Sequence, residues 1–108
     1  MNEETKQRYP WLRQMSDEDL AFIKRFVLAS GSLKELAADY GISYPTVRLR
    51  LDRLIEKIRV VEDPALQSEF ERTVRAMYAE GRIDMNGVKQ LLGAHQREFN
   101  QEKQHAGE

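Results

Sequence analysis

Residues 32–58 read SLKELAADYGISYPTVRLRLDRLIEKI, and this stretch decides the fold. It contains the start and stop signals of two helices in quick succession. Ser32 and Glu35 form the S-x-x-E pattern that caps a helix N-terminus, and Gly41 can end that helix in a left-handed conformation. Ser43 is then a good N-cap for a second helix. The stretch therefore predicts two helices joined by a very short turn.

The offsets between these residues are those of a helix-turn-helix unit. Such a unit needs a small residue where the helices cross, a residue that tolerates a left-handed backbone four positions later, and then an apolar plug. Ala37, Gly41 and Ile42 occupy these positions. The second helix needs a cap and an apolar residue one turn later, which Ser43 and Val47 supply. A plain pair of helices that meet at a glycine is the alternative interpretation.

Segments on both sides of this unit also carry helix signals. Three acidic residues follow Ser16, an arrangement that suits the positive end of a helix dipole. In the second half of the chain, Asp63 is expected to cap a helix that Gly81 ends. Asp84 is expected to cap a last helix that continues to about Phe99. Because strand signals are almost absent, helices alone are expected.

These signals predict an all-α fold in which a tri-helical helix-turn-helix unit is followed by a C-terminal helical hairpin. We expect a helix-turn-helix domain with an N-terminal arm over residues 1–61, the helical hairpin over residues 62–99, and a flexible tail over residues 100–108. Trp11 is expected to pack that arm over the core, and an anchor at a partner interface is the alternative role for it.

Composition and charge limit the classes of protein that this chain can belong to. The chain has 108 residues, enough for one domain, and no cysteine. Disulfides and thiolate zinc sites are thus excluded, and a cytoplasmic location is expected. No apolar run approaches the ~20 residues of a membrane span or resembles a secretory signal, so no membrane partner is expected. The net charge of −1 argues mildly against nucleic-acid binding unless one face is basic.

The second helix of the unit is the candidate recognition helix. Apolar residues recur in it at spacings of four, three and four, and these inward positions are Val47, Leu51, Leu54 and Ile58. The opposite face is then expected to expose Pro45, Leu49, Asp52 and Glu56. From Ser43 to Arg59 there are five basic and two acidic residues, a net of +3 in an otherwise acidic chain. A thin basic stripe is therefore expected along this helix.

The residue types on this helix suit contacts with DNA. Arginine can pair with guanine, leucine can touch the methyl group of thymine, and a helix N-terminus favours a phosphate. The residues predicted to bind double-stranded DNA are Ser43, Tyr44, Thr46, Arg48, Leu49, Arg50, Arg53 and Lys57. The alternative is an ordinary solvated face on which the arginines pair with acids one turn away.

These features favour a small DNA-binding transcription regulator. Because one unit with a net charge of +3 makes few phosphate contacts, a homodimer through the C-terminal hairpin is expected. The alternative is a protein-interaction module that keeps a helix-turn-helix shape and binds a partner of the sigma or anti-sigma type. No catalytic, cofactor or metal site is expected, since His95 and His105 lack a ligand pattern around them and the acids after Ser16 are explained as a helix cap.

Three segments of the chain match the pattern of a known family. Residues 41–52 read GISYPTVRLRLD, residues 15–23 read MSDEDLAFI, and residues 78–92 have the apolar spacing of a helical hairpin. In these segments the chain resembles a bacterial family catalogued as a domain of unknown function (number 2089). The resemblance implies a helix-turn-helix transcription regulator. Typical members also carry an N-terminal zinc ribbon with four cysteines, to which nothing in this cysteine-free sequence corresponds.

Overall fold

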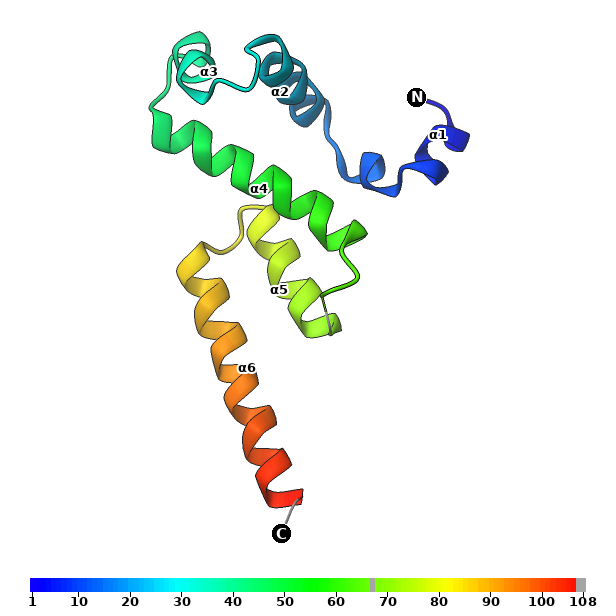
Figure 1. Ribbon diagram of the computed structural model, residues 1–108, viewed down its shortest axis with the longest axis vertical. Coiled ribbons are helices and arrows are strands. Elements are labelled where there is room, and N and C mark those ends of the chain that lie inside the picture. Colours follow the sequence, from blue (N-terminus) through cyan, green and yellow to red (C-terminus); the bar gives the residue numbers. More distant parts are fainter. Residues whose placement is uncertain (67, 107–108) are drawn as a thin grey trace.

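The structure is a computed structural model that describes residues 1–66 and 68–106. In this part of the chain all regular elements are helices, as the sequence predicts (Figure 1). In chain order they are α1 (Glu3–Arg8), the 3-10 helix η1 (Pro10–Gln14), α2 (Asp17–Leu28), α3 (Leu33–Tyr40), α4 (Tyr44–Glu62), α5 (Glu69–Ala79) and α6 (Met85–Ala106). None of the described helices combines the length and the apolar character needed to cross a membrane.

Helices α2, α3 and α4 form a three-helix head around one hydrophobic core (Figure 1). Each helix contributes one side chain that is almost completely removed from solvent, namely Phe22, Leu36 and Val47. Burying a side chain of this size stabilises the fold by roughly 1.5–3 kcal/mol. The predicted tri-helical helix-turn-helix unit is therefore confirmed.

The turn between α3 and α4 has the geometry that the sequence predicts. Gly41 adopts a left-handed conformation with φ 66°, and the Ser43 hydroxyl accepts a hydrogen bond from the Thr46 backbone N–H at 3.3 Å. Ile42 differs in part from the expected plug, since it stays 38% exposed. The inward role falls mainly to Val47, one turn into α4.

Side-chain caps fix the starts of α2 and α3. Ser16 and Asp19 cap α2 reciprocally, with 3.1 Å from the Asp19 N–H to the Ser16 hydroxyl and 3.0 Å from the Ser16 N–H to the Asp19 carboxylate. At α3, the Ser32 hydroxyl accepts from the Glu35 N–H at 3.2 Å. Caps of this kind contribute about 1 kcal/mol each.

The hairpin consists of α5 and α6, and its first helix begins later than predicted. Asp63 does not cap α5, because α4 continues to Glu62 and Asp63 ends it, with its carboxylate accepting from the Ala65 N–H at 2.8 Å. Ser68 is the N-cap of α5 instead, at 3.1 Å from the Glu71 N–H. The last turns of α4 pack against α5, and this burial favours a longer α4 over the local capping signal of Asp63.

The second helix of the hairpin begins where the sequence predicts. The Asp84 carboxylate accepts from the Gly87 N–H at 2.8 Å and so caps α6. A second, smaller core joins α5 to α6 through Val74, Tyr78 and Val88. Each of the two cores is thus assembled from neighbouring elements of the chain.

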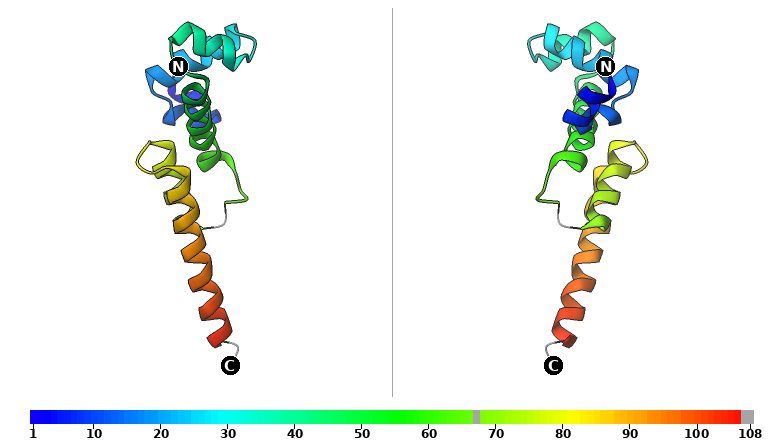
Figure 2. Two further views of the ribbon diagram at one scale, coloured as in Figure 1. Left: turned by 90° about the vertical axis from the view of Figure 1, so that its left-hand side faces the viewer. Right: turned by 90° about the vertical axis from the view of Figure 1, so that its right-hand side faces the viewer.

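The molecule is elongated, because α6 projects away from the head (Figures 1 and 2). Its radius of gyration is 17.5 Å, whereas a compact chain of this length has about 13 Å. Helix α6 continues beyond Phe99 to Ala106, so the predicted end at Phe99 is too early. Residues 107 and 108 lie outside the described residues, and the flexibility expected for 100–108 stays a prediction.

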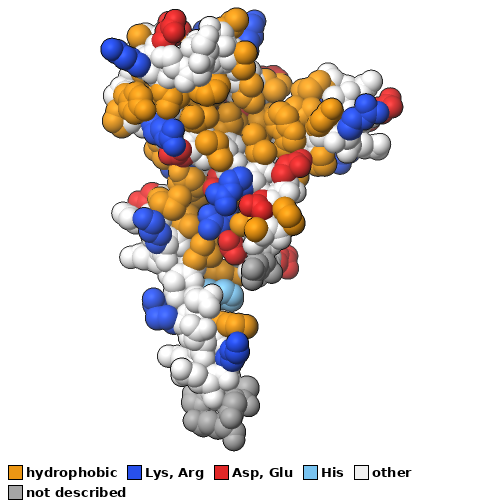
Figure 3. Space-filling view, viewed as in Figure 1, with side chains coloured by type: hydrophobic (Ala, Val, Ile, Leu, Met, Phe, Trp, Pro, Cys, Tyr) orange, Lys and Arg blue, Asp and Glu red, His pale blue; other side chains and the backbone are white. Residues whose placement is uncertain are grey.

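An apolar hollow of about 220 Å³ opens between α2 and α4. Trp11 of η1 lines it together with Phe22, Phe26, Leu51 and Ile58. Figure 3 shows hydrophobic side chains gathered over this side of the head. Trp11 is only half-buried there, so the N-terminal arm covers the core incompletely.

We expect Gly41→Ala to lower the free energy of unfolding by about 1–2 kcal/mol, because an L side chain is strained in the left-handed region. A Cβ at this position meets nothing within 4 Å, so the loss reports the backbone alone. Urea denaturation measures it. Gly93→Ala in the middle of α6 is the matched control and should be neutral or stabilising. Equal stability of the Gly41→Ala variant and the unmodified protein would contradict the assigned turn.

Candidate nucleic-acid interface

Helix α4 lies between the other two helices of the head, α2 and α3, and the hairpin, and its two halves have different surroundings (Figures 1 and 2). The C-terminal half packs against α5 and η1. The N-terminal half packs against α2 and α3 in the core of the head. The exposed residues of the N-terminal half, among them Tyr44, Arg48 and Leu49, offer a face to a partner.

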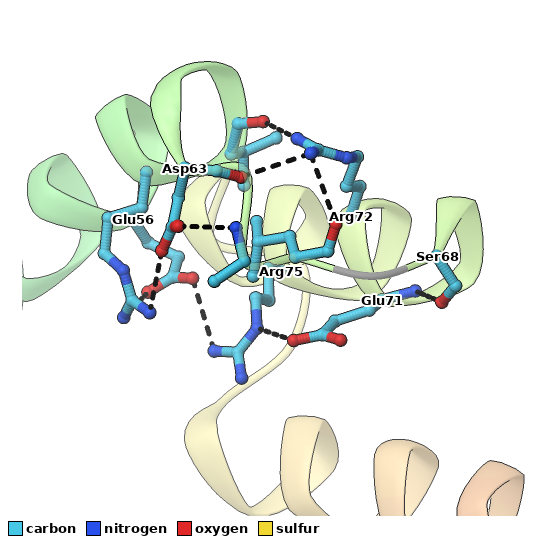
Figure 4. Close-up of polar contacts among 10 residues, drawn as sticks. Glu56, Asp63, Ser68, Glu71, Arg72 and Arg75 are labelled. Carbon is cyan, nitrogen blue, oxygen red and sulfur yellow. Dashed lines mark hydrogen bonds and ion pairs between the residues drawn. The ribbon is translucent and has the colours of Figure 1, made fainter.

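Glu56 does not face solvent as predicted, since α5 covers the side of α4 from which it projects. Glu56 is only 5% exposed and is the one buried charged residue of the described chain. Its carboxylate lies 3.3 Å from Arg75 of α5 and 3.5 Å from Arg59 of α4 (Figure 4). Arg75 also contacts Glu71 at 3.1 Å. The Glu56 carboxylate is thus part of the α4–α5 contact.

A second arginine of α5 holds the end of α4. The Arg72 guanidinium donates to the backbone carbonyls of Val60, Asp63 and Leu66, the latter two at 3.2 and 3.3 Å (Figure 4). Carbonyls at a helix C-terminus lack partners within the helix, so a guanidinium there satisfies them. Arg72 and Arg75 together fasten α5 to α4.

Arg53, a predicted DNA contact, projects toward the hairpin instead of toward solvent. Its guanidinium donates to the backbone carbonyls of Tyr78 and Ile83 and lies 4.8 Å from the centre of the Tyr78 ring. Burial raises the pKa of Tyr78 above 10.0, and the negative charge of Asp52 adds to the rise, while the charge of Arg53 opposes it. The contacts of Arg53 therefore join α4 to the hairpin.

Lys57, another predicted DNA contact, is paired inside the protein with Asp19 of α2 at 2.6 Å. Burial tends to raise the pKa of Asp19. Hydrogen bonds from Lys57 and Ser16 and the charge of Lys57 outweigh it and hold the pKa below 3.8. Lys57 therefore joins the end of α4 to the start of α2.

Arg50 lies over two aromatic rings of the head. Its guanidinium is 5.0 Å from the centre of the Phe22 ring and 5.5 Å from that of Tyr40. Arg25 of α2 covers Tyr40 as well, at 4.6 Å. Such contacts occupy the faces of the rings and keep the Arg50 side chain half-buried.

Five of the eight predicted residues remain on the exposed N-terminal half of α4. Tyr44 is 52% exposed and Leu49 is 43% exposed. Arg48 is exposed and pairs with Asp52 at 3.2 Å. The other two predicted residues there, Ser43 and Thr46, share a hydrogen bond between their hydroxyls at 2.8 Å. The structure thus separates a small exposed set from Arg50, Arg53 and Lys57, which have partners inside the protein.

The residue pattern of α4 alone does not predict the structural roles of Arg53, Arg72 and Arg75. A helical wheel centred on Val47 has no information on whether a second helix covers the opposite face. Among the described residues, no three histidine or acidic side chains gather as metal ligands do. The exposed surface of the N-terminal half of α4 is a short face with both polar and apolar residues.

We expect Arg53→Ala to lower the free energy of unfolding by about 2 kcal/mol, because two backbone carbonyls lose their donor. Arg48→Ala removes an exposed arginine from the same helix and should change the free energy of unfolding by less than about 0.5 kcal/mol. Urea denaturation of the two variants in parallel tests the difference. Similar losses in both would show that the Arg53 contacts do not support the fold.

Because the pKa of Asp19 is lowered on folding, its pairing stabilises the protein above pH 3.8 and this contribution is lost as the pH falls through the folded-state pKa. We expect Asp19→Asn to be less stable than the unmodified protein at about pH 6 and to approach it below about pH 3. Denaturation midpoints across that range measure this. Asp17→Asn, in the same turn but exposed, is the control. A gap that stays constant with pH would refute the assignment.

The helix-turn-helix part of the chain has a counterpart among known families. Residues 15–61 match a family model described as "Domain of unknown function (DUF2089)-HTH". No curated protein and no solved structure matches the chain. The match spans α2, α3 and nearly all of α4 and ends before the hairpin, where the resemblance stays a prediction. Over residues 15–61, which are less than half of its 108 residues, the chain is therefore similar to the DUF2089 helix-turn-helix family.

Proposed function

We propose that this chain is a non-catalytic, cytoplasmic transcription regulator that reads double-stranded DNA with the N-terminal half of α4. The observation that carries the proposal is the division of that half into an inner and an outer side. Val47 is fully buried, while Tyr44, Arg48 and Leu49 stand on the outer side. A helix anchored in this way, after a capped turn, has the form that enters the major groove.

Each exposed side chain has a DNA group that suits it. Arg48 has the donors for the O6 and N7 atoms of guanine, and Leu49 suits the methyl group of thymine. The first turn, capped by Ser43, carries partial positive charge that favours a backbone phosphate. The Arg48–Asp52 pair does not prevent this, because an exposed pair of this kind contributes at most about 1 kcal/mol.

The covered half of α4 sets a limit on DNA affinity. Arg53, Lys57 and Arg59 have partners inside the protein, so the net charge of +3 along this helix overstates the charge available to phosphates. Few phosphate contacts mean a shallow salt dependence and weak binding by a single copy. We therefore propose that two copies act together on two half-sites.

We expect Arg48→Ala to weaken binding to duplex DNA roughly tenfold and to reduce the slope of log K against log salt by about 1 if the guanidinium also neutralises a phosphate. Fluorescence anisotropy with labelled DNA from the chain's own upstream region, across a salt series, measures both.

Arg97→Ala is the control for this experiment, because it removes the same charge from an exposed position on α6. It should leave affinity unchanged. No binding by the unmodified protein at low salt to upstream or random DNA would refute the proposal.

A protein partner in place of DNA is the second candidate, and one observation favours it. Tyr44, Leu49 and Ile42 are each between 38% and 52% exposed near the start of α4, which gives this surface an apolar character. The variant Leu49→Arg separates the two functions. It should abolish docking of an apolar protein surface, while electrostatic attraction to DNA is kept or increased.

A further inference from the structure

Helix α6 is much longer than the helix that supports it. It has 22 residues, whereas α5 has 11. From Ala94 to Gln104 every residue of α6 is exposed. The exposed part includes Phe99, which is 56% exposed although it is a large aromatic residue. Within the described chain, His95 at the start of this half stacks on Phe70 of α5, and the turns after it are exposed throughout.

The stripe that α5 covers continues into this uncovered half. Val88, Leu92, His95 and Phe99 follow one another at spacings of four, three and four residues, the spacing of a coiled-coil seam. Val88 is 2% exposed against α5, and His95 stacks on Phe70 at the start of α5, with ring centres 4.2 Å apart. Beyond that stack the same face of α6 has no cover. Phe99 thus extends an interface that already exists inside the protein.

A hollow that could receive side chains of a further helix is present at the point where α5 begins. A hollow of about 340 Å³ is lined by Ser68, Glu71, Leu92, His95, Gln96 and Phe99. It lies along the uncovered continuation of the seam. A second helix placed against Phe99 therefore meets an indented surface instead of the end of α5.

The charges beside Phe99 select the orientation of that second helix. With Leu92 and Phe99 on the seam, Glu98 and Lys103 fall on its two flanks. In a parallel pair of α6 helices, Glu98 of each copy faces Lys103 of the other. In an antiparallel pair, like charges meet. Neither residue takes part in any ion pair found in the described chain, so both remain available.

We propose that a second copy of this chain is the partner of α6, and that the two α6 helices pair in parallel around Phe99. A parallel pair leaves both heads at the same end, because α6 projects away from the head (Figure 1). The use of that arrangement for two half-sites rests on the proposed function, whereas the pairing itself does not. Since the polar residues His95 and Glu102 occupy other seam positions, the paired segment is short and the pairing is weak. The fraction of paired chains therefore rises with protein concentration.

The absence of cysteine from the sequence makes this geometry directly testable. Residues of equal number meet on the seam of a parallel pair. Single variants Phe99→Cys and Glu102→Cys should therefore both form disulfide-linked dimers under mild oxidation without DNA. Arg97→Cys, on the far side of α6, is the control and should remain monomeric at the same concentration. In an antiparallel pair only one of the two seam positions can lie at the centre, so crosslinking of one alone overturns the parallel arrangement.

A charge exchange tests the same pairing without a crosslink. Glu98→Lys should raise the dimer dissociation constant, measured by sedimentation equilibrium, by roughly fivefold or more. Adding Lys103→Glu should return it to within roughly twofold of the unmodified value. Absence of crosslinking at both seam positions, or no rescue by the second exchange, overturns the proposal. These measurements contain no DNA. The pairing of α6 can therefore be refuted while Arg48-dependent DNA binding is confirmed, and DNA binding can be refuted while the pairing is confirmed.

Discussion

The contact between α4 and α5 is the constraint on which the shape of the molecule depends, and Glu56 is at its centre. A buried carboxylate is tolerable only when it is paired, and removing a partner from such a pair costs about 3–5 kcal/mol. Arg75 reaches Glu56 from α5, and Arg72 holds the carbonyls at the end of α4 (Figure 4). These contacts act only when α5 lies at one angle across α4. The hairpin is therefore fixed to α4.

The head could be predicted from the sequence because its signals are local. Caps such as Ser16 and Ser43 and the left-handed Gly41 depend on residues within one turn, and the pattern of α4 around Val47 reports one buried face. The start of α5 and the burial of Glu56 could not be predicted in this way. Both follow from contacts between α4 and α5, and a wheel that places one face of α4 inward assigns the opposite face to solvent by default. For the same reason the exposed set around Arg48 was predicted, but the internal role of Arg53 was not.

The arginines of α4 differ in how firmly contacts within the protein hold them. Arg50 and Arg53 cover aromatic rings, and Arg53 also donates to backbone carbonyls, so moving either to a phosphate would expose groups that they now satisfy. Arg48 has only an exposed acid beside it and loses little by changing partner. Whether an arginine is available to a ligand thus depends on the contacts within the protein that it would lose. The number of basic residues along the helix is a poor guide to this availability.

The length of α6 follows from how helices form. Starting a helix is unfavourable, whereas each added residue costs little, and an isolated helix shorter than about 12 residues is marginal in water. The first turns of α6 are held by the Asp84 cap and by Val88 against α5, so the unfavourable step is supported by tertiary contacts. The remaining turns propagate from that start through residues with good helix propensity, such as Gln, Glu, Lys and Arg. Because α6 packs against α5 and α5 packs against α4, Phe99 and Arg48 lie on helices that are joined by an unbroken series of packing contacts.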